Sequence, residues 1–196
     1  MKKKPDVWTL TQAARVLGEP QHRLIYLCEK GVIDPDFRDA KGRGSSRRFS
    51  ARNLLEFAIA LRLRELDIGV TFVGAIIHVL RAFERSVGKE LRGFKLPDSL
   101  RDPRAPDLRV VIADGARLYF TLAAPRSPAH VYGGINLQDV TSSQATAHAL
   151  GRGLAARRAS GKRSTSGGLG GPEGSRFLRL ELSITELARA LDLATA

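Results

Sequence analysis

Residues 8–35 read WTLTQAARVLGEPQHRLIYLCEKGVIDP and predict two short helices joined by a tight turn. From residue 10 to residue 17, the apolar side chains follow the i, i+3, i+4, i+7 spacing of an amphipathic helix. Thr9 is expected to cap that helix and Gly18 to end it. A second short helix follows Pro20. Two helices joined by so short a turn favour a helix-turn-helix unit.

A basic loop comes next, because residues 41–50 read KGRGSSRRFS and contain no acidic side chain. Glycines at the tip, with Arg47 and Phe49 at the exit, fit a small β-wing. Ser50 is expected to cap a third helix. We therefore expect a winged helix-turn-helix over residues 8–70.

A further helix is expected over residues 71–92. Its apolar residues are spaced 3, 4, 3 and 4 apart and predict a coiled-coil seam of about two heptads. The seam residues are Val73, Ile76, Leu80, Phe83 and Val87. Two heptads are too short to stand alone, so we expect the seam to pair with a copy of itself and to make a homodimer. The alternative is packing inside one chain, as most amphipathic helices do.

The pattern changes after this helix. Three prolines within residues 93–107 indicate a linker. Beyond it, Asp114-Gly115 predicts the tight two-residue turn of a β-hairpin. Strands are expected at 108–113, 116–122, 131–137 and 178–184. Ser183 is expected to open a last short helix that runs to about Leu193.

Composition narrows the class of protein. The 196 residues carry a formal net charge of +12, which favours a polyanionic partner because Lys and Arg displace counterions from phosphates. The single cysteine, Cys28, excludes an internal disulfide and disfavours a thiolate metal site. No apolar run approaches the roughly 18 residues of a transmembrane helix. No apolar run follows the basic start either, so we expect a cytoplasmic protein with no signal peptide and no membrane contact.

Positive charge is concentrated in two regions. Residues 1–101 hold 20 basic and 12 acidic side chains, hence +8, and residues 151–176 hold 6 basic and 1 acidic, hence +5. The second region lacks large apolar residues and is expected to be disordered. Either it binds nucleic acid without sequence preference, or it is a solubilising insertion. The alternative function is therefore a non-specific nucleic-acid-binding or protein-recruiting adaptor without operator specificity.

The order of helix, turn, helix, basic wing, helix and seam helix resembles the MerR family of bacterial transcription regulators. The resemblance covers about residues 8–92, a little under half of the chain. It rests on the segment 8–14, on Tyr26, Gly31, Val32, Ile33 and Pro35, on Arg47 and Phe49 at the wing, and on Leu66, Ile68, Gly69 and Val70 before the seam helix. Ile25 and Leu27 depart from the family, in which an arginine and a tyrosine stand at those places, and Arg23 is expected to serve instead.

The resemblance implies a homodimer that binds a pseudo-palindromic promoter site in double-stranded DNA, distorts it, and works with RNA polymerase. Arg and Gln of the second helix can pair with base edges in the major groove, whereas wing arginines contact phosphates. The expected DNA-contacting residues are Arg15, Gln21, His22, Arg23, Tyr26, Lys41, Arg43, Arg47, Arg48 and Arg52. Activation and repression both stay open.

No pattern indicates an enzyme. The four histidines are far apart and show no metal-ligand spacing. No motif places a Ser, His and Asp together for nucleophilic catalysis. We expect no catalytic residues, no metal and no cofactor.

The predicted fold class is a mostly α N-terminal winged helix-turn-helix with a long dimerisation helix, followed by a small α+β C-terminal module. The expected parts are a basic N-terminal tail (1–7), the winged helix-turn-helix DNA-binding domain (8–70), the dimerisation helix (71–92), the linker (93–107) and the C-terminal module (108–196) with its disordered basic loop (about 151–176).

Overall fold

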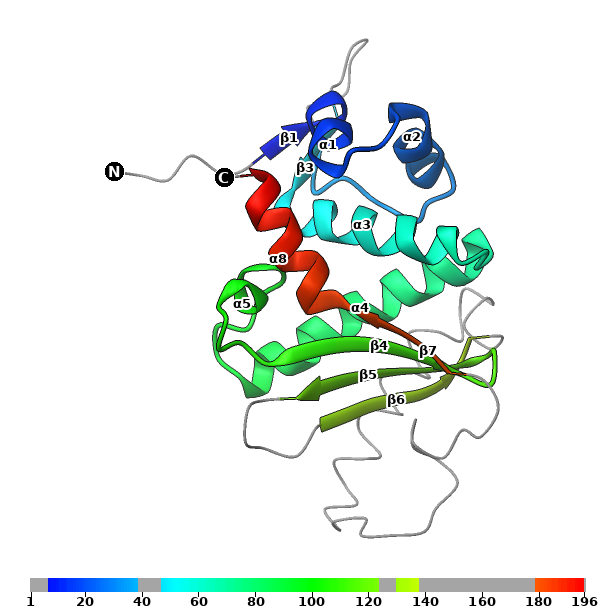
Figure 1. The fold of residues 1–196 in the computed structure, drawn as a ribbon, viewed down its shortest axis with the longest axis vertical. Coiled ribbons are helices and arrows are strands. Elements are labelled where there is room, and N and C mark those ends of the chain that lie inside the picture. The colour runs from blue at the N-terminus through cyan, green and yellow to red at the C-terminus, as the bar shows by residue number, and fades with distance from the viewer. Residues whose placement is uncertain (1–6, 39–46, 124–129, 138–178, 196) are drawn as a thin grey trace, which may run out of the picture.

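The structure is a computed structural model, and it describes residues 7–38, 47–123, 130–137 and 179–195. The helices are α1 (Leu10–Leu17), α2 (Gln21–Glu29), α3 (Ala51–Glu65), α4 (Val70–Glu90), α5 (Asp98–Arg101) and α8 (Ile184–Thr195). The strands are β1 (Val7–Thr9), β2 (Phe37–Arg38), β3 (Arg47–Ser50), β4 (Asp107–Ala113), β5 (Arg117–Ala123), β6 (His130–Asn136) and β7 (Arg179–Ser183). Figure 1 shows α1, α2 and a small sheet at one end, α3, α4 and α8 in the middle, and a four-stranded sheet at the other end.

Capping residues define the first helix where the sequence predicts them. Thr9 Oγ1 accepts a hydrogen bond from the Gln12 N–H, and the Gln12 side chain accepts one from the Thr9 N–H at 2.9 Å. Gly18 ends α1 in the left-handed conformation, with φ 67°. Helix α2 begins directly after Pro20, so the turn between the two helices is as short as predicted.

The small sheet has the strand order β1-β3-β2 and forms the base of the wing. Strands β2 and β3 are antiparallel, with Phe37 opposite Arg48. Phe49 on β3 is fully buried, and its ring packs edge-on against Phe57 of α3, with the ring centroids 5.2 Å apart. This aromatic pair anchors the wing to α3. The predicted tip of the wing, residues 39–46, lies outside the described residues.

Helix α3 is the central element of the molecule. Ser50 caps it as predicted, since Ser50 Oγ accepts a hydrogen bond from the Asn53 N–H at 3.2 Å. Ten of its fifteen residues are buried. The helix is buried on nearly all sides because it lies between the α1–α2 pair, α4 and α8 (Figure 1).

Helix α4 packs inside the chain. The five residues predicted to form a dimer seam are at most 2% exposed in a single chain: Val73, Ile76, Leu80, Phe83 and Val87. Phe83 stacks on Phe120 of β5, with ring centroids 5.2 Å apart. It also makes edge-on contacts with Phe94 and Tyr132. The seam is therefore buried within the chain, and Phe83 packs against the four-stranded sheet.

The predicted fold class, mostly α with a long dimerisation helix, is wrong because α4 packs within the chain and the strands form two sheets. The chain is mixed α/β, with six helices and two antiparallel sheets among its described residues. It is not a mostly α protein with a long dimerisation helix. A heptad seam and the buried face of a helix that lies on a sheet have the same spacing, so the periodicity alone did not separate the two.

The predicted linker over residues 93–107 is packed rather than extended. It contains the short helix α5, and Leu96 and Leu100 are buried. Arg189 of α8 donates a hydrogen bond from Nη2 to the carbonyl oxygen of Asp102 at 3.1 Å. The segment therefore joins the helices to the sheet through apolar and polar contacts.

The larger sheet has the strand order β6-β5-β4-β7. Its central hairpin turns at Asp114 and Gly115, as predicted, and both residues have positive φ. The Ala116 N–H donates to the Ala113 carbonyl at 3.2 Å. Ala113 lies opposite Arg117, so the connection is one residue longer than the predicted two-residue turn. The strand predicted over 178–184 is β7, at one edge beside β4.

Glycine is required where β6 approaches β5. Gly133 has φ 124°, and a Cβ there would lie 2.5 Å from the Leu118 carbonyl oxygen. The register between the two strands shifts at this place, between Leu118 and Tyr119. Only glycine permits this close approach.

One apolar core joins the parts that the sequence analysis assigned to different domains. It includes Ala13 of α1, Leu54 of α3, Leu80 of α4, Phe120 of β5 and Leu191 of α8. Helix α8 follows the sheet and runs back to α1 (Figure 1). The C-terminal module is thus built into the same body as the helix-turn-helix unit.

Several sequence predictions lie outside the described residues. These are residues 1–6 of the predicted tail, the basic loop at 151–176, and two predicted DNA contacts, Lys41 and Arg43. Of the helices that the structure describes, none has the length and apolar character needed to span a membrane.

Candidate nucleic-acid interface

The side chains predicted to contact bases lie on the outward side of α2. All four are at least partly exposed: Gln21, His22, Arg23 and Tyr26. Gln21 Nε2 donates a hydrogen bond to Thr11 Oγ1 of α1 at 2.8 Å. Arg23 Nη1 lies 2.6 Å from Glu19 Oε2. Two of the four side chains thus have partners within the chain, which they must exchange in order to contact a base.

The wing strand β3 carries two exposed arginines, Arg47 and Arg48. Side chains alternate along a strand, so Arg47 lies on the same face as the buried Phe49. Burial raises the pKa of the Cys28 thiol on α2, and the nearby charge of Arg47 opposes this rise. Arg48 lies on the opposite face of β3 from Arg47.

The two remaining predicted contacts differ in their surroundings. Arg15 is exposed in the last turn of α1. Arg52 Nη2 lies 2.5 Å from Asp36 Oδ1, and its guanidinium is 3.9 Å from the carboxylates of Glu56 and Glu84. Three carboxylates offset the charge of Arg52, so a phosphate contact there has less electrostatic support than at the wing.

A buried asparagine fixes the position of the wing. Asn53 Oδ1 accepts hydrogen bonds from the N–H groups of Asp36 at 2.9 Å and Ser50 at 3.2 Å. Its Nδ2 donates to the Asp34 carbonyl at 3.0 Å and to Glu56 Oε2 at 3.1 Å. The four bonds use the four hydrogen-bonding positions of an amide side chain. One side chain thus ties the segment after α2, the wing strand and α3 together.

A buried ion pair continues from this asparagine to α4. Glu56 is 1% exposed, and Arg81 binds it with two hydrogen bonds, Nε to Oε1 at 2.6 Å and Nη2 to Oε2 at 2.7 Å. The hydrogen bonds that Arg81 donates to Glu56 raise the pKa of Arg81, and the negative charges of Glu56, Asp34 and Asp36 add to this rise, whereas burial opposes it. The sequence analysis missed this pair. The available signal was a single carboxylate inside the apolar run of residues 54–61, LLEFAIAL.

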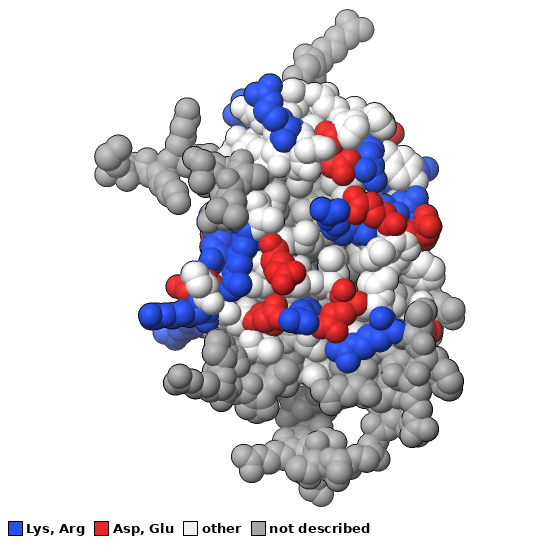
Figure 2. Space-filling view, in the orientation of Figure 1, with Lys and Arg blue, Asp and Glu red and all other residues white. Residues whose placement is uncertain are grey.

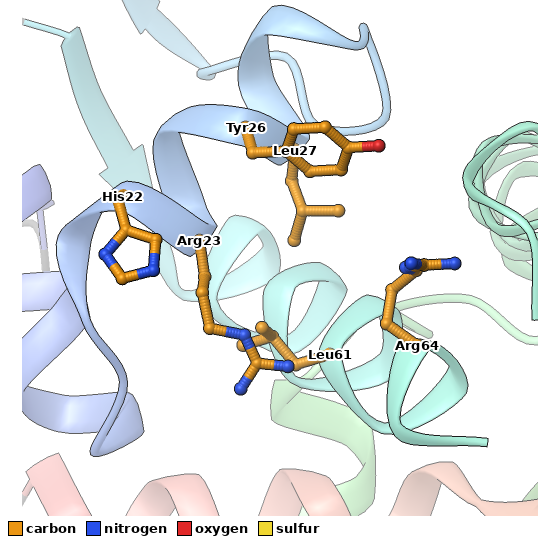
Figure 3. Close-up of a pocket in the computed structure, with 6 residues that line it drawn as sticks. All are labelled: His22, Arg23, Tyr26, Leu27, Leu61 and Arg64. Atoms are coloured by element: carbon orange, nitrogen blue, oxygen red, sulfur yellow. The ribbon is translucent and has the colours of Figure 1, made fainter. Parts of the chain in front are cut away.

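An open groove of about 410 Å³ lies between α2 and the C-terminal half of α3 (Figure 3). It is lined by His22, Arg23, Tyr26, Leu27, Leu61 and Arg64. In the view of Figure 3, the side chain of Arg23 extends toward Leu61, and the guanidinium of Arg64 lies apart from it, farther along α3. The sequence analysis missed Leu61 and Arg64, because helical spacing carries no signal for which residues of two different helices face each other.

Charge is mixed on the face of the molecule shown in Figure 2. Among the coloured residues there, Lys and Arg side chains lie next to Asp and Glu side chains, and no uninterrupted basic patch forms. Surface ion pairs such as Arg62–Glu65, at 2.7 Å, also offset positive charge. The net charge of +12 therefore does not mark this face as the binding surface.

No protein-family model and no curated protein matches this chain. The likeness to MerR regulators rests on the residues named in the sequence analysis. Within the described ranges, no group of three or more His, Cys, Asp or Glu side chains is arranged to hold a metal ion.

Proposed function

We propose that this chain is a DNA-binding transcription regulator similar to the MerR family, with α2 in the major groove and the wing on the phosphate backbone. The four hydrogen bonds of the buried Asn53 carry the proposal, because they tie the segment after α2 to α3 and to the wing strand with its exposed arginines. Contacts with the phosphate backbone set the register of a reading helix, whereas contacts to base edges set specificity.

When α2 contacts base edges, two of its side chains must exchange a partner within the chain for a base. Gln21 gives up Thr11, and Arg23 gives up Glu19, when each contacts a base. A partly exposed ion pair contributes about 0–1 kcal/mol to stability, whereas a bidentate contact with the correct base is worth roughly 1–3 kcal/mol of discrimination. The exchange is therefore favourable only at matching bases, which is the behaviour that a specific regulator needs.

The homodimer and its pseudo-palindromic site remain part of the proposal. The five seam residues of α4 are buried within each chain, so a dimer has to form through another surface. Size-exclusion chromatography with light scattering measures the oligomeric state with and without DNA. Double-stranded DNA and RNA polymerase at the promoter are the proposed partners.

The wing can be tested with one substitution and a matched control. Arg47→Ala is expected to weaken binding to every DNA sequence and to reduce the slope of log K against log salt by about 1. Arg117→Ala removes an exposed arginine from β5 in the larger sheet, and is expected to leave both quantities unchanged. Fluorescence anisotropy at several salt concentrations measures them. If Arg47→Ala binds as the wild type does, the wing does not contact DNA.

The same titration separates the second candidate, a non-specific nucleic-acid-binding or protein-recruiting adaptor. The net charge of +12 favours this candidate, because it supports salt-dependent binding to any nucleic acid. Equal affinity for promoter and shuffled DNA, with a steep salt dependence, would select it over the regulator.

A further inference from the structure

We propose that the groove between α2 and α3 binds a small aromatic carboxylate, a ligand with a flat apolar body and one negative charge. The groove offers about 410 Å³, which lies within the roughly 300–1,000 Å³ that small-molecule sites occupy. Its lining combines apolar and aromatic side chains, which suit the body of the ligand, with two arginines, which suit its negative charge.

The cationic groups select the carboxylate. Arg23 and Arg64 line the groove, Lys30 lies over the ring of Tyr26, and Glu19 is the carboxylate paired with Arg23. Arg64 Nη1 donates to the Ile68 carbonyl at 2.7 Å, which holds the guanidinium at the end of α3. A guanidinium has five N–H donors and binds carboxylates with two parallel hydrogen bonds. Arg64 is therefore the proposed anchor.

The apolar groups select an aromatic body. Leu27 and Leu61, which are buried, form the floor of the groove. The ring of Tyr26 forms a wall and is 40% exposed. Lys30 Nζ lies 5.7 Å from the centroid of that ring. The two leucines are at most 5% exposed, so the exposed ring of Tyr26 offers the larger apolar surface. A flat ring can stack on Tyr26 while its carboxylate reaches Arg64, an apolar contact that inorganic phosphate cannot make.

Ligand binding in the groove is expected to compete with DNA binding, an inference that rests on the proposed function. His22, Arg23 and Tyr26 line the groove and are also proposed to contact bases. A bound ligand covers them and holds Arg23, so the ligand and DNA exclude each other. The groove then makes DNA binding responsive to a metabolite.

The binding step is tested without DNA. The full chain is titrated by calorimetry with 1-naphthoate, with the neutral analogue 1-naphthamide, and with inorganic phosphate. We expect saturable binding of 1-naphthoate below about 1 mM and at least tenfold weaker binding of the amide, since one hydrogen-bonded charge corresponds to a factor of about ten. Phosphate is expected not to displace 1-naphthoate. No saturation, equal affinity of acid and amide, or displacement by phosphate would overturn the proposal.

Two variants and a control locate the site. Arg64→Gln is expected to weaken 1-naphthoate binding at least tenfold and to bring its affinity close to that of the amide. Arg62→Gln is the matched control, because Arg62 lies on the same helix, pairs with Glu65 and does not line this groove; its affinity should stay within about twofold. Tyr26→Ala changes an exposed side chain, and it replaces Arg64→Gln if circular dichroism shows that the latter is unfolded. Unchanged affinity in the folded variant places the ligand elsewhere and contradicts the proposal.

A DNA competition completes the test. Saturating 1-naphthoate should release labelled promoter DNA, and 1-naphthamide at the same concentration should not. Ligand and DNA bound together would show that the groove is not shared, and would contradict the proposed exclusion. If the chain binds no DNA at all, the proposed function fails, and the direct titration still decides whether the groove binds a carboxylate.

Discussion

The buried carboxylate of Glu56 connects α3 to α4 through its ion pair with Arg81. It is 1% exposed and is held by Arg81 and Asn53. We expect Glu56→Gln to lower the free energy of unfolding by roughly 3–5 kcal/mol. The loss should lie toward the lower end, because the Arg81 side chain is 21% exposed and water can partly solvate its charge.

The matched control for Glu56 is Glu65 on the same helix. Glu65 also pairs with an arginine, Arg62, but that pair lies on the surface. Glu65→Gln is expected to change the free energy of unfolding by less than about 1 kcal/mol. Urea denaturation at neutral pH measures both variants. Equal losses in the two would contradict the structural role assigned to the buried pair.

His78 on α4 is expected to make a small contribution to the dependence of stability on pH, because its side chain is exposed. Partial burial of the imidazole lowers the pKa of His78 below its ordinary value of 6.5, and the charges of Arg85 and Arg81 lower it further. The unfolded chain therefore takes up a proton at this site before the folded chain does. The stabilising contribution is fully present above about pH 6.5 and is lost as the pH falls through that value toward the pKa of the folded state.

A substitution isolates this contribution from those of the other histidines. Between about pH 7.5 and about pH 5.5, the Tm of the wild type should fall further than the Tm of His78→Gln, because only the wild type has this proton to take up. Differential scanning calorimetry measures both. Parallel decreases in the two proteins would show that His78 does not couple stability to pH.

At the residue scale, sequence reasoning found caps and missed buried polar contacts. Thr9, Gly18 and Ser50 act through their immediate neighbours, so the local sequence contains the whole signal. Asn53 and Arg81 act across the fold. Asn53 bonds to Asp34 and Asp36, and Arg81 to Glu56 on another helix, and no spacing rule states which distant groups will meet.

At the scale of elements, the difference between local and long-range contacts explains why α4 was wrongly predicted to be a dimerisation helix. Its 3, 4, 3, 4 spacing correctly predicts a helix with one apolar face. The face is buried within the chain, and Phe83 meets a sheet whose strands, but not whose position, the sequence predicts. Phe83 shows the result, because its ring stacks on Phe120 of β5 in the same chain.

Phe83 provides the test of how α4 packs. Phe83→Ala removes a buried ring that contacts three other aromatic rings, and is expected to cost roughly 3–5 kcal/mol of unfolding free energy. Leu91→Ala at the end of the same helix is the control, since Leu91 is an exposed side chain; it should cost less than about 0.5 kcal/mol. A nearly neutral effect of Phe83→Ala would mean that α4 does not rest on the sheet.

At the scale of the whole molecule, the C-terminal helix α8 supports the proposed DNA-binding part. Ala188 lies in the core and is 1% exposed, whereas Ala190 is exposed two residues later. Ala188→Glu buries an unpaired charge and is expected to destabilise the entire chain by at least about 3 kcal/mol. Ala190→Glu should leave stability within about 0.5 kcal/mol of the wild type.

The form of the unfolding transition distinguishes one body from two. Far-ultraviolet circular dichroism should show a single transition for Ala188→Glu, displaced to lower temperature, because α1, α3 and the sheet share the core that α8 completes. A transition that splits, with the N-terminal helices as stable as in the wild type, would restore the separate domains that the sequence analysis expected.

The binding of promoter DNA tests the central claim most directly. The purified chain is titrated by fluorescence anisotropy with DNA from upstream of its own coding region and with the same DNA shuffled, at several salt concentrations. A specific regulator is expected to prefer the promoter by at least about a thousandfold at physiological salt, and footprinting should then show a protected two-fold site. Equal binding to both DNAs, or binding to neither at moderate salt, would contradict the proposal that α2 and the wing read an operator.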